Sequence, residues 1–470
     1  MSIVYAQNTD FRKAGTMVAD HTNTQADALA TRAQNHATLV SALHKGRHAD
    51  AFDAERRSLE LSLERMLYDR VANAPVPFDG ECGIEAVLAK IAELWQGCAQ
   101  EWSDGHLVGL VAKRAVGGTT VNVSISVGAG GQLVCTAGPT LRIAELKDAL
   151  DEFDRAIHVA ASRLGCDYAL AAEGYNPYAS SPLDVSLVPC TKWTLLSAQL
   201  SQTGRYARDA MRCSYATQIS LDYGNERDAI TAYRTAVALT PLFMFLTDNV
   251  RSFRGCDARR CPRMVRATIW QEVDPARCGI VPGTFDEDFS FERYVSWLEG
   301  LLPVLYSDGS GTTISTGKRT LAEFMEGQVL TQRDALQFYD IAFPFVRLGS
   351  RIELLQADAL HPRLAMGYAA FVKGLFCNGL ALDATRDLIG IVSEDDVQEA
   401  IRELRLRGWD ALVYGQRTGE LVDKLIRIAR SGLEDIGERR MLGELATLWE
   451  VRMVPRDAFV QQEIKARRGW

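Results

Sequence analysis

The chain has 470 residues, of which 47% are hydrophobic and 24% are charged. These values are typical of a globular protein, and they exclude wholesale disorder and collagen-like repeats. The net charge of −8 argues against a dedicated nucleic-acid-binding protein, whose surface carries a strong excess of basic residues.

In the first half of the chain, helical and strand patterns alternate. Residues 58–68 alternate leucines with polar side chains, which predicts a strand. Two further alternating runs flank the sequence Gly-Ala-Gly-Gly at 128–131, which predicts a β-hairpin of strands 121–127 and 132–136. Apolar residues at helical spacing predict helices over 22–45, 85–102 and 141–164.

The second half adds short strands and then becomes helical. Strand patterns cover 167–172, 217–223 and 345–355. A helix is predicted over 225–246, broken near Pro241. From Ser393, which with Asp396 has the spacing of an N-cap, the chain reads as helical. We therefore expect one α+β domain over residues 21–470, with an antiparallel sheet and a helical C-terminal part over 390–470.

Three features of the sequence predict a cytoplasmic protein. The longest apolar run, residues 236–246, is shorter than the roughly 18 residues that a membrane helix needs. Residues 1–20 lack the apolar core of a signal peptide, and we expect them to form a flexible arm. The ten cysteines have no framework spacing, which is typical of reduced thiols. We expect no attachment to a membrane.

Common catalytic motifs are absent from the sequence. It contains no GxxxxGK[ST] phosphate loop, no GxGxxG dinucleotide fingerprint and no GxSxG nucleophile elbow. Cys256, Cys261 and Cys278 are too loosely spaced for a zinc site, and His44 with His48 is better explained as a surface pair.

Polar side chains on the predicted strands are more informative. Two interpretations fit them: several strands that present a polar inner face would line a cavity, or these faces point to solvent on a half-exposed antiparallel sheet. The residues are Glu60, Glu64, Gln132, Gln218, Asp222 and Glu353.

A set of motifs along the chain resembles the glutamate–cysteine ligases, in particular the plant-type and proteobacterial branch with its ergothioneine-pathway relatives. Residues 124–134 (SISVGAGGQLV) resemble that family's SISLEPGGQFEL hairpin, and 344–348 (PFVRL) with 352–354 (IEL) resemble PEVRL and LEL. Further motifs follow in the family's order at 174–177 (GYNP), 189–193 (PCTKW), 211–222, 266–282, 289–294 (FSFERY) and 429–433 (ARSGL).

The resemblance implies a fold and a chemistry. The fold would be glutamine-synthetase-like, a funnel-shaped antiparallel sheet with helices packed outside. In the family, ATP phosphorylates the γ-carboxylate of glutamate and an amine attacks the acyl phosphate. Mg²⁺ ions neutralise the anionic reactants, and Mg²⁺ prefers carboxylate oxygens. The resemblance therefore implies ATP and Mg²⁺ as cofactors, with an amino acid or another small carboxylate and an amine as substrates.

Residue by residue, the resemblance assigns roles within the funnel. Glu353 and Arg347 are the expected catalytic residues. Metal ligands are expected at Glu353 and at either Glu60 or Glu64, because two registers fit the first strand. The expected substrate-binding residues, which we predict to face one cavity together with Glu353, are Gln132, Lys192, Trp193, Gln218, Arg266 and Trp270.

The sequence departs from the family's pattern where charged ligands are expected. Glutamates of the pattern are replaced at Ser62 or Met66, and at Gly128, Val134 and Phe345. Arginines of the pattern are replaced at Lys192, Thr268 and Leu355. We therefore expect weak or absent Mg²⁺-ATP binding. Two readings remain: a ligase with altered substrate or metal use, or an inactive homologue that binds a small molecule, a partner protein or a second copy of itself.

Overall fold

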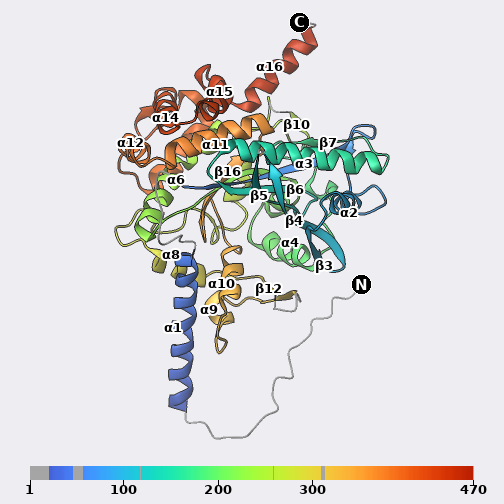
Figure 1. Ribbon diagram of the computed structural model, residues 1–470. Helices are drawn as coiled ribbons and strands as arrows, with labels where there is room; N and C mark the ends of the chain where they lie inside the picture. Colours follow the sequence, from blue (N-terminus) through green and yellow to red (C-terminus); the bar gives the residue numbers. More distant parts are fainter. Residues whose placement is uncertain (1–20, 46–56, 117, 258, 308–312, 469–470) are drawn as a thin grey trace.

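The computed structural model describes residues 21–45, 57–116, 118–257, 259–307 and 313–468. It mixes helices with a large antiparallel sheet, as expected for an α+β protein (Figure 1). The expected arm at 1–20 lies outside the described residues. The main path of the sheet runs, in order, through β15 (Val346–Leu348), β16 (Ile352–Asp358), β8 (Ala216–Leu221), β1 (Leu59–Asp69), β6 (Leu133–Thr140), β5 (Thr119–Val127), β4 (His106–Val116) and β3 (Ala99–Ser103).

β1 is the organising strand of the sheet. Its first half pairs with β8 on one side and β6 on the other, and its second half pairs with β7 (Tyr168–Ala171) and β2 (Ala74–Pro75). The remaining short strands form two-stranded pairs: β9 (Ser252–Phe253) with β10 (Cys256–Asp257), β11 (Cys278–Gly279) with β14 (Phe343–Pro344), β12 (Leu305–Ser307) with β13 (Thr313–Ser315), and β17 (Leu412–Val413) with β18 (Gln416–Arg417).

Alternation along the strands separates the two faces of the sheet. Leu59, Leu61 and Leu63 of β1 are fully buried, and the residues between them are only half-buried. The buried face packs on α3 (Ile143–Arg163), α6 (Glu226–Leu246) and α11 (Pro362–Phe376). In Figure 1, α3 and α11 lie side by side over this face, with α14 (Thr418–Gly432) and α15 (Ile436–Glu450) beyond them.

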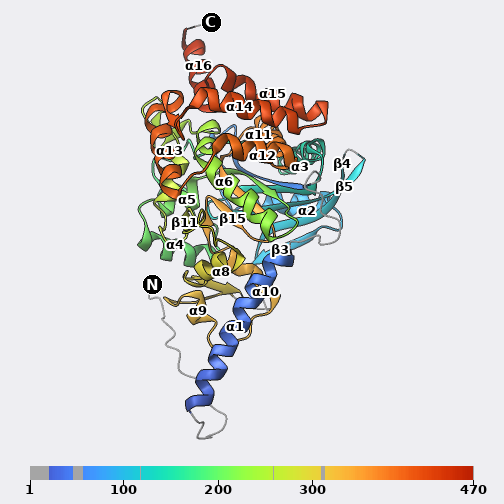
Figure 2. The same cartoon turned by 90° about the vertical axis from the view of Figure 1, so that its left-hand side faces the viewer.

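Helices on the opposite face of the sheet form the roof of a cavity. They are α4 (Thr191–Thr203), α5 (Ala207–Cys213) and α7 (Val265–Gln271). α1 (His21–Lys45) projects from the body at one end and α16 (Pro455–Arg468) at the other (Figures 1 and 2). The other helices are α2 (Ile84–Leu94), α8 (Phe291–Glu299), α9 (Leu321–Phe324), α10 (Gln332–Tyr339), α12 (Gly379–Ile389) and α13 (Glu394–Arg407).

Most predicted elements are confirmed, and two are corrected. The predicted helix over 85–102 ends at Leu94, and residues 99–103 form β3 at the edge of the sheet. The expected break in α6 is absent, because nearly all of its residues from Ala229 onward are buried in the core, where packing holds the helix together around Pro241. The N-cap at Ser393 is present as a capping box with Asp396.

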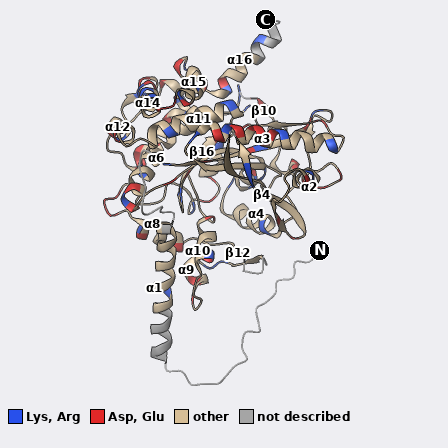
Figure 3. Ribbon diagram, viewed as in Figure 1, with Lys and Arg blue, Asp and Glu red and all other residues tan. Residues whose placement is uncertain are grey.

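α6 is the core helix behind the sheet. By length and composition alone it could cross a membrane, as could α11 with α12 if that pair, bent by 89°, were one segment. However, 89% of the apolar window of α6 is buried inside the protein. Elsewhere on the surface, acidic and basic side chains are interspersed, as on α3 and α14 (Figure 3). The ten cysteines form no disulfide.

Candidate functional site

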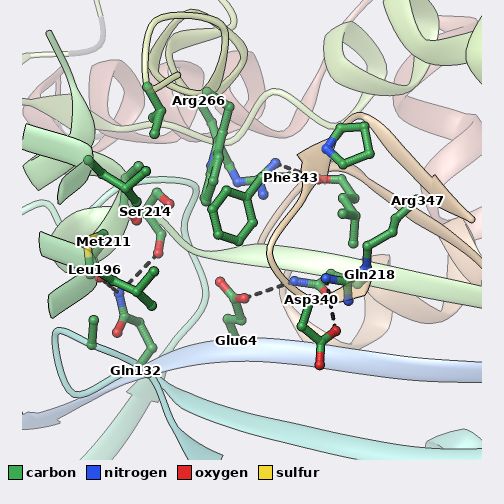
Figure 4. Close-up of a pocket in the computed structure, with 18 of the residues that line it drawn as sticks. Glu64, Gln132, Leu196, Met211, Ser214, Gln218, Arg266, Asp340, Phe343 and Arg347 are labelled. Carbon is green, nitrogen blue, oxygen red and sulfur yellow. Dashed lines mark hydrogen bonds and ion pairs between the residues drawn. The ribbon is translucent and has the colours of Figure 1, made fainter. Parts of the chain in front are cut away.

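A cavity of about 280 Å³ lies between the polar face of the sheet and the helices that roof it. Five strands of the sheet contribute to its lining, and the roof comes from α4, α5, α7 and the segment 340–345 (Figure 4). Of the two interpretations of the polar strand residues, the lined cavity is confirmed at this end of the sheet. The strand residues are Glu64, Val134, Gln218, Arg347 and Leu355.

Of the ten residues to which the resemblance assigns a role, eight meet at this cavity. They come from segments far apart in the chain: Glu64, Gln132, Lys192, Trp193, Gln218, Arg266, Trp270 and Arg347. Two do not. Glu353 and Glu60 lie outside the lining, farther along the same sheet face, so the expectation that Glu353 faces the cavity is wrong. The reason is the register: both residues pair with Ser220 from opposite sides, whereas Gln218 and Glu64 lie nearer the cavity.

Glu64 forms the polar floor of the cavity. One of its oxygens accepts a hydrogen bond from the Ala216 backbone N–H at 2.8 Å, and the other accepts one from Gln218 Nε2 at 3.0 Å. Burial raises the pKa of Glu64 above its usual value, and the positive charge of Arg266 and these two donors oppose that rise. Both carboxylate oxygens are therefore engaged by the protein itself.

Arg266 is a buried cation in the roof. It is only 6% exposed, and its Nη1 donates to the backbone oxygens of Leu355 at 2.9 Å and Gln356 at 3.2 Å. Burial lowers the pKa of Arg266, although the charges of Asp358 and Glu64 favour the cation. Its guanidinium also lies over the Trp270 ring, 5.8 Å from the ring centre. Arg266 is therefore held in place by carbonyl oxygens and a ring.

Gln132 holds the glycine-rich hairpin turn against α5. Its Oε1 accepts from the Gly130 N–H at 2.8 Å, and its Nε2 donates to the Met211 carbonyl at 2.9 Å (Figure 4). These bonds occupy both ends of the amide. A Cβ atom on Gly128 would lie 2.6 Å from Gln132 Oε1, so a larger residue cannot stand at 128 while Gln132 keeps this position.

Lys192 is a basic residue of the cavity lining whose positive charge is not balanced by an acidic partner among the described residues. Its side chain is exposed, and its Nζ lies over the Trp193 ring at 4.6 Å from the ring centre. No carboxylate within the described ranges lies in ion-pair distance of Lys192. Arg347, by contrast, is paired with Asp340 at 3.2 Å and with Glu353 at 2.6 Å.

Much of the remaining lining is apolar. Sequence reasoning did not assign it, because apolar residues on helices read as core. The helices α4 and α5 contribute Leu196, Leu200, Ala210 and Met211, and the rest includes Met244, Val273, Phe343, Pro344 and Phe345. Asp340, which ends α10 and pairs with Arg347, was also missed, since no motif surrounds it.

A second group of charges follows the same sheet face beyond the cavity. We name Glu60, Asp222 and Glu353, with Arg351, the acidic strip. Arg351 pairs with Asp222 at 2.9 Å, and Glu353 pairs with Arg347. Burial raises the pKa of Glu60; the charges of Glu353 and Asp222 add to the rise, and Arg351 opposes it. Of the two candidate glutamates on β1, Glu60 is therefore the one that lies near Glu353.

The family's chemistry uses two or three Mg²⁺ ions, which need carboxylate ligands. Within the cavity lining, both oxygens of Glu64 already accept hydrogen bonds and the other carboxylate is Asp340, so the lining offers too few carboxylates for two or three ions. In the acidic strip, Glu60 and Glu353 are two carboxylates on one face, which suits one hard divalent cation completed by phosphate oxygens and water. The site fits one such ion and not three.

Comparisons with known proteins agree with the motifs. The sequence model of glutamate-cysteine ligase family 2 matches residues 61–447. Chloroplastic glutamate–cysteine ligase B of Oryza sativa subsp. japonica is 24% identical over 339 residues, which cover 70% of this chain and 66% of the relative. The enzymes of Arabidopsis thaliana and Nicotiana tabacum are 23% and 22% identical, over 74% and 79% of this chain and 66% and 72% of the relatives.

The match to the rice and Arabidopsis relatives spans slightly less than two-thirds of their own length. The family match, by contrast, extends over most of this chain, from β1 to α15. It includes the strands and helices that carry the cavity and the acidic strip. The chain therefore belongs to glutamate-cysteine ligase family 2, as a divergent member.

Proposed function

We propose that this protein is a carboxylate–amine ligase of γ-glutamyl type with an altered acid substrate, built on a glutamine-synthetase-like funnel. Family membership supports a ligase-like function. The antiparallel sheet with one polar face and helices on the other supports the funnel. The cavity at the end of that face is where we place the acid.

The observation that carries the proposal is the charge balance of the cavity. Its lining contains three basic side chains, Lys192, Arg266 and Arg347, and two acidic ones, Glu64 and Asp340. Within the lining, Arg347 is paired with Asp340, and Arg266 and Glu64 offset one another in charge. Lys192 is left over. A lining with one excess cation at its edge is complementary to a carboxylate, which Lys192 would hold as a point charge.

The shape and polarity of the lining indicate the rest of the substrate. Met211 and Leu196 line the cavity on one side and Phe343 lines it elsewhere (Figure 4), so the bound acid would carry an apolar body. Gln132 and Glu64, which could otherwise bind an amino-acid headgroup, are occupied by hydrogen bonds within the protein. We therefore propose an acid more apolar than glutamate, with its carboxylate toward Lys192.

Arg347 stands at the border between the cavity and the acidic strip. Its guanidinium is fixed by Asp340 on one side and Glu353 on the other. A fixed guanidinium stabilises negative charge that develops on a reacting carboxyl or phosphoryl group. In this proposal Arg347 is the catalytic residue, and Glu353 positions it. One divalent cation held by Glu60 and Glu353 would supply charge neutralisation for a phosphate, and we expect Mg²⁺-ATP to bind weakly.

Calorimetric titration of the full chain with small carboxylic acids of graded apolar size tests the acid site. We expect apolar acids to bind more tightly than glutamate, and Lys192→Met to weaken the best of them at least about tenfold, as for the loss of a charged contact. Lys113→Met, at an exposed position of β4, is the matched control, and this variant should bind the acids as the unchanged protein does. Equal affinity of the unchanged protein and Lys192→Met would contradict the assignment.

A second candidate function rests on a specific observation. Of the positions where a charged residue of the family pattern is replaced by an uncharged one, Gly128, Val134, Phe345 and Leu355 line the cavity, whereas Ser62, Met66 and Thr268 do not. An inactive homologue that binds a small molecule or a partner subunit would have such a cavity. This candidate predicts that the acid binds but that no acid and amine together cause ATP hydrolysis.

A further inference from the structure

A second hollow, of about 380 Å³, has a lining that shares no residue with that of the cavity. We name it the arginine pocket and define it by Arg205, Arg208 and Arg254, with the hydroxyl groups of Ser180, Ser181 and Ser201. Its walls come from the segment before α5, the end of α4, the 180–183 turn and Arg254. No motif in the sequence pointed to it.

Only one of the three arginines is neutralised. Arg254 makes a two-pronged ion pair with the buried Asp209, with Nε–Oδ1 at 2.8 Å and Nη2–Oδ2 at 2.6 Å. Tyr175 also donates to Asp209 Oδ1, at 3.0 Å. Both oxygens of Asp209 are therefore occupied, and it has no capacity left for the other arginines.

Arg205 and Arg208 keep their charges free. In the part of the chain that the structure describes, neither has a carboxylate within ion-pair distance. Arg205 lies over the Tyr206 ring at 5.0 Å, and Arg254 lies over the same ring at 5.1 Å, so the two guanidiniums are held on one aromatic support. Asp184, the nearby acid of the turn, is used by the backbone N–H groups of Ser180 and Ser181.

The neighbourhood adds further positive charge. Arg212 follows Arg208 by one turn of α5 and donates to the Val185 carbonyl at 2.8 Å. Burial lowers the pKa of Arg212, and the charge of Arg208 lowers it further. The hydroxyls of Ser180 and Ser201 hold no hydrogen bond to other described residues, so they remain available as donors.

We propose that the arginine pocket binds the phosphate groups of a small phosphorylated molecule, without a metal ion. Guanidinium groups match phosphate oxygens in pairs, and they bind them through charge-assisted hydrogen bonds. Two free guanidiniums beside free hydroxyls suit a diphosphate better than a single carboxylate. The site is distinct from the acid-binding cavity, because the two linings have no residue in common.

Titration calorimetry of the full chain with pyrophosphate at two salt concentrations tests the proposal. We expect binding that weakens with salt and is at least about tenfold weaker in Arg205→Gln/Arg208→Gln, because two charged contacts are lost. Arg402→Gln/Arg417→Gln removes the same charge from exposed positions in α13 and β18 and should bind as the unchanged protein does. Thermal unfolding of both variants should match the unchanged protein, because all four side chains are exposed.

Two further arms separate this site from others and identify its ligand. Lys192→Met, which alters the acid-binding cavity, should leave pyrophosphate binding unchanged. ATP and ADP should compete with pyrophosphate, and adenosine should not, if the phosphates are what is recognised. No pyrophosphate binding, equal weakening in both arginine double variants, or loss of binding in Lys192→Met would each overturn the proposal.

Discussion

Glu64 on β1 and Gln218 on β8 share a hydrogen bond of 3.0 Å at the floor of the cavity. With the Ala216 N–H on the other oxygen, this bond makes Glu64 a structural acceptor and leaves it poorly suited to bind a metal. Glu60, four residues earlier on the same face, lies among the other charged residues of the acidic strip. Two glutamates of one strand are thereby given different roles.

Replacing Glu64 separates its hydrogen bonds from its charge. In Glu64→Gln, Gln218 can turn its amide and keep both bonds, so we expect the free energy of unfolding to change by less than about 1 kcal/mol. In Glu64→Leu the Ala216 N–H and the Gln218 amide lose their acceptor, which should cost about 2 kcal/mol or more. Urea unfolding at pH 7 measures both. Equal losses in the two variants would show that the hydrogen bonds do not hold the floor.

Gly128 and Gln132 should be energetically coupled. Gly128→Ala brings a Cβ to 2.6 Å from Gln132 Oε1 and should destabilise the protein by about 1–3 kcal/mol. Gln132→Ala loses the clamp on Gly130 and Met211, with a similar cost. In the double variant the contact with Oε1 is gone and a milder one with the Cβ of residue 132, at 3.2 Å, remains, so its loss should be smaller than the sum by about 1 kcal/mol. Additive losses in this double-mutant cycle would disprove the contact.

The strand patterns of the sequence predicted the sheet well, because the alternation that gives a strand one apolar face is visible in the residues of that strand alone. Leu59, Leu61 and Leu63 alternate as the structure requires. The helix predicted to 102 failed at its end, since an exposed edge strand such as β3 has no buried face to mark it. Pro241 was misread because core packing, which overrides the local break, involves residues distant in the chain.

The site was predictable only in part. The resemblance correctly predicted eight residues of the cavity lining. The position of each residue along the sheet depends on the strand register, which the sequence around Glu60 and Glu64 left open. The sequence could not predict that the Gln132 amide donates hydrogen bonds to the backbone carbonyls of Met211 and Ser214, because those residues lie 79 and 82 positions away in sequence. The arginine pocket likewise depends on three segments that meet only in the folded chain.

Glu173 should make the protein more stable at low pH than at high pH within a defined window. It is 6% exposed and has one partner, Arg251 at 3.1 Å. Burial raises the pKa of Glu173 to about 7, although Arg251 opposes the rise. A raised pKa means that its contribution is fully present below the unfolded value of 4.5 and is lost as the pH rises through 7.

Glu173→Gln should remove this dependence. The difference in unfolding free energy between Glu173→Gln and the unchanged protein should grow in favour of the variant from pH 5 to pH 8, by up to about 3 kcal/mol. Urea unfolding at several pH values gives the difference, and Glu450→Gln on the exposed end of α15 serves as control. A difference that stays constant with pH would contradict the raised pKa.

His36 ties α1 to α8 in a way that depends on its proton. Its two ring nitrogens lie against Glu292 and Glu299, the latter at 3.1 Å. Burial lowers the pKa of His36, but hydrogen bonds to the two glutamates and their charges outweigh it, so the pKa is raised above 6.5. The stabilisation is therefore complete below pH 6.5 and is lost as the pH rises through the folded value.

Amide hydrogen exchange in α1 measures this attachment. After correction for the intrinsic rate, we expect faster exchange in α1 at pH 8.5 than at pH 6, and little difference in His36→Asn, which cannot be protonated. The buried strand β8 is the internal reference and should not respond. A response of α1 that persists in His36→Asn would assign the pH dependence to another group.

The most direct test of the central claim is phosphate release from ATP by the full chain with Mg²⁺, an apolar acid that binds in the cavity, and a panel of amines. We predict release only when ATP, acid and amine are all present, with Lys192→Met lowering kcat/KM for the acid at least about tenfold, because the charged contact to its carboxylate is lost. An acid that binds tightly in calorimetry and yet gives no phosphate release with any amine would contradict the ligase and establish the inactive homologue instead.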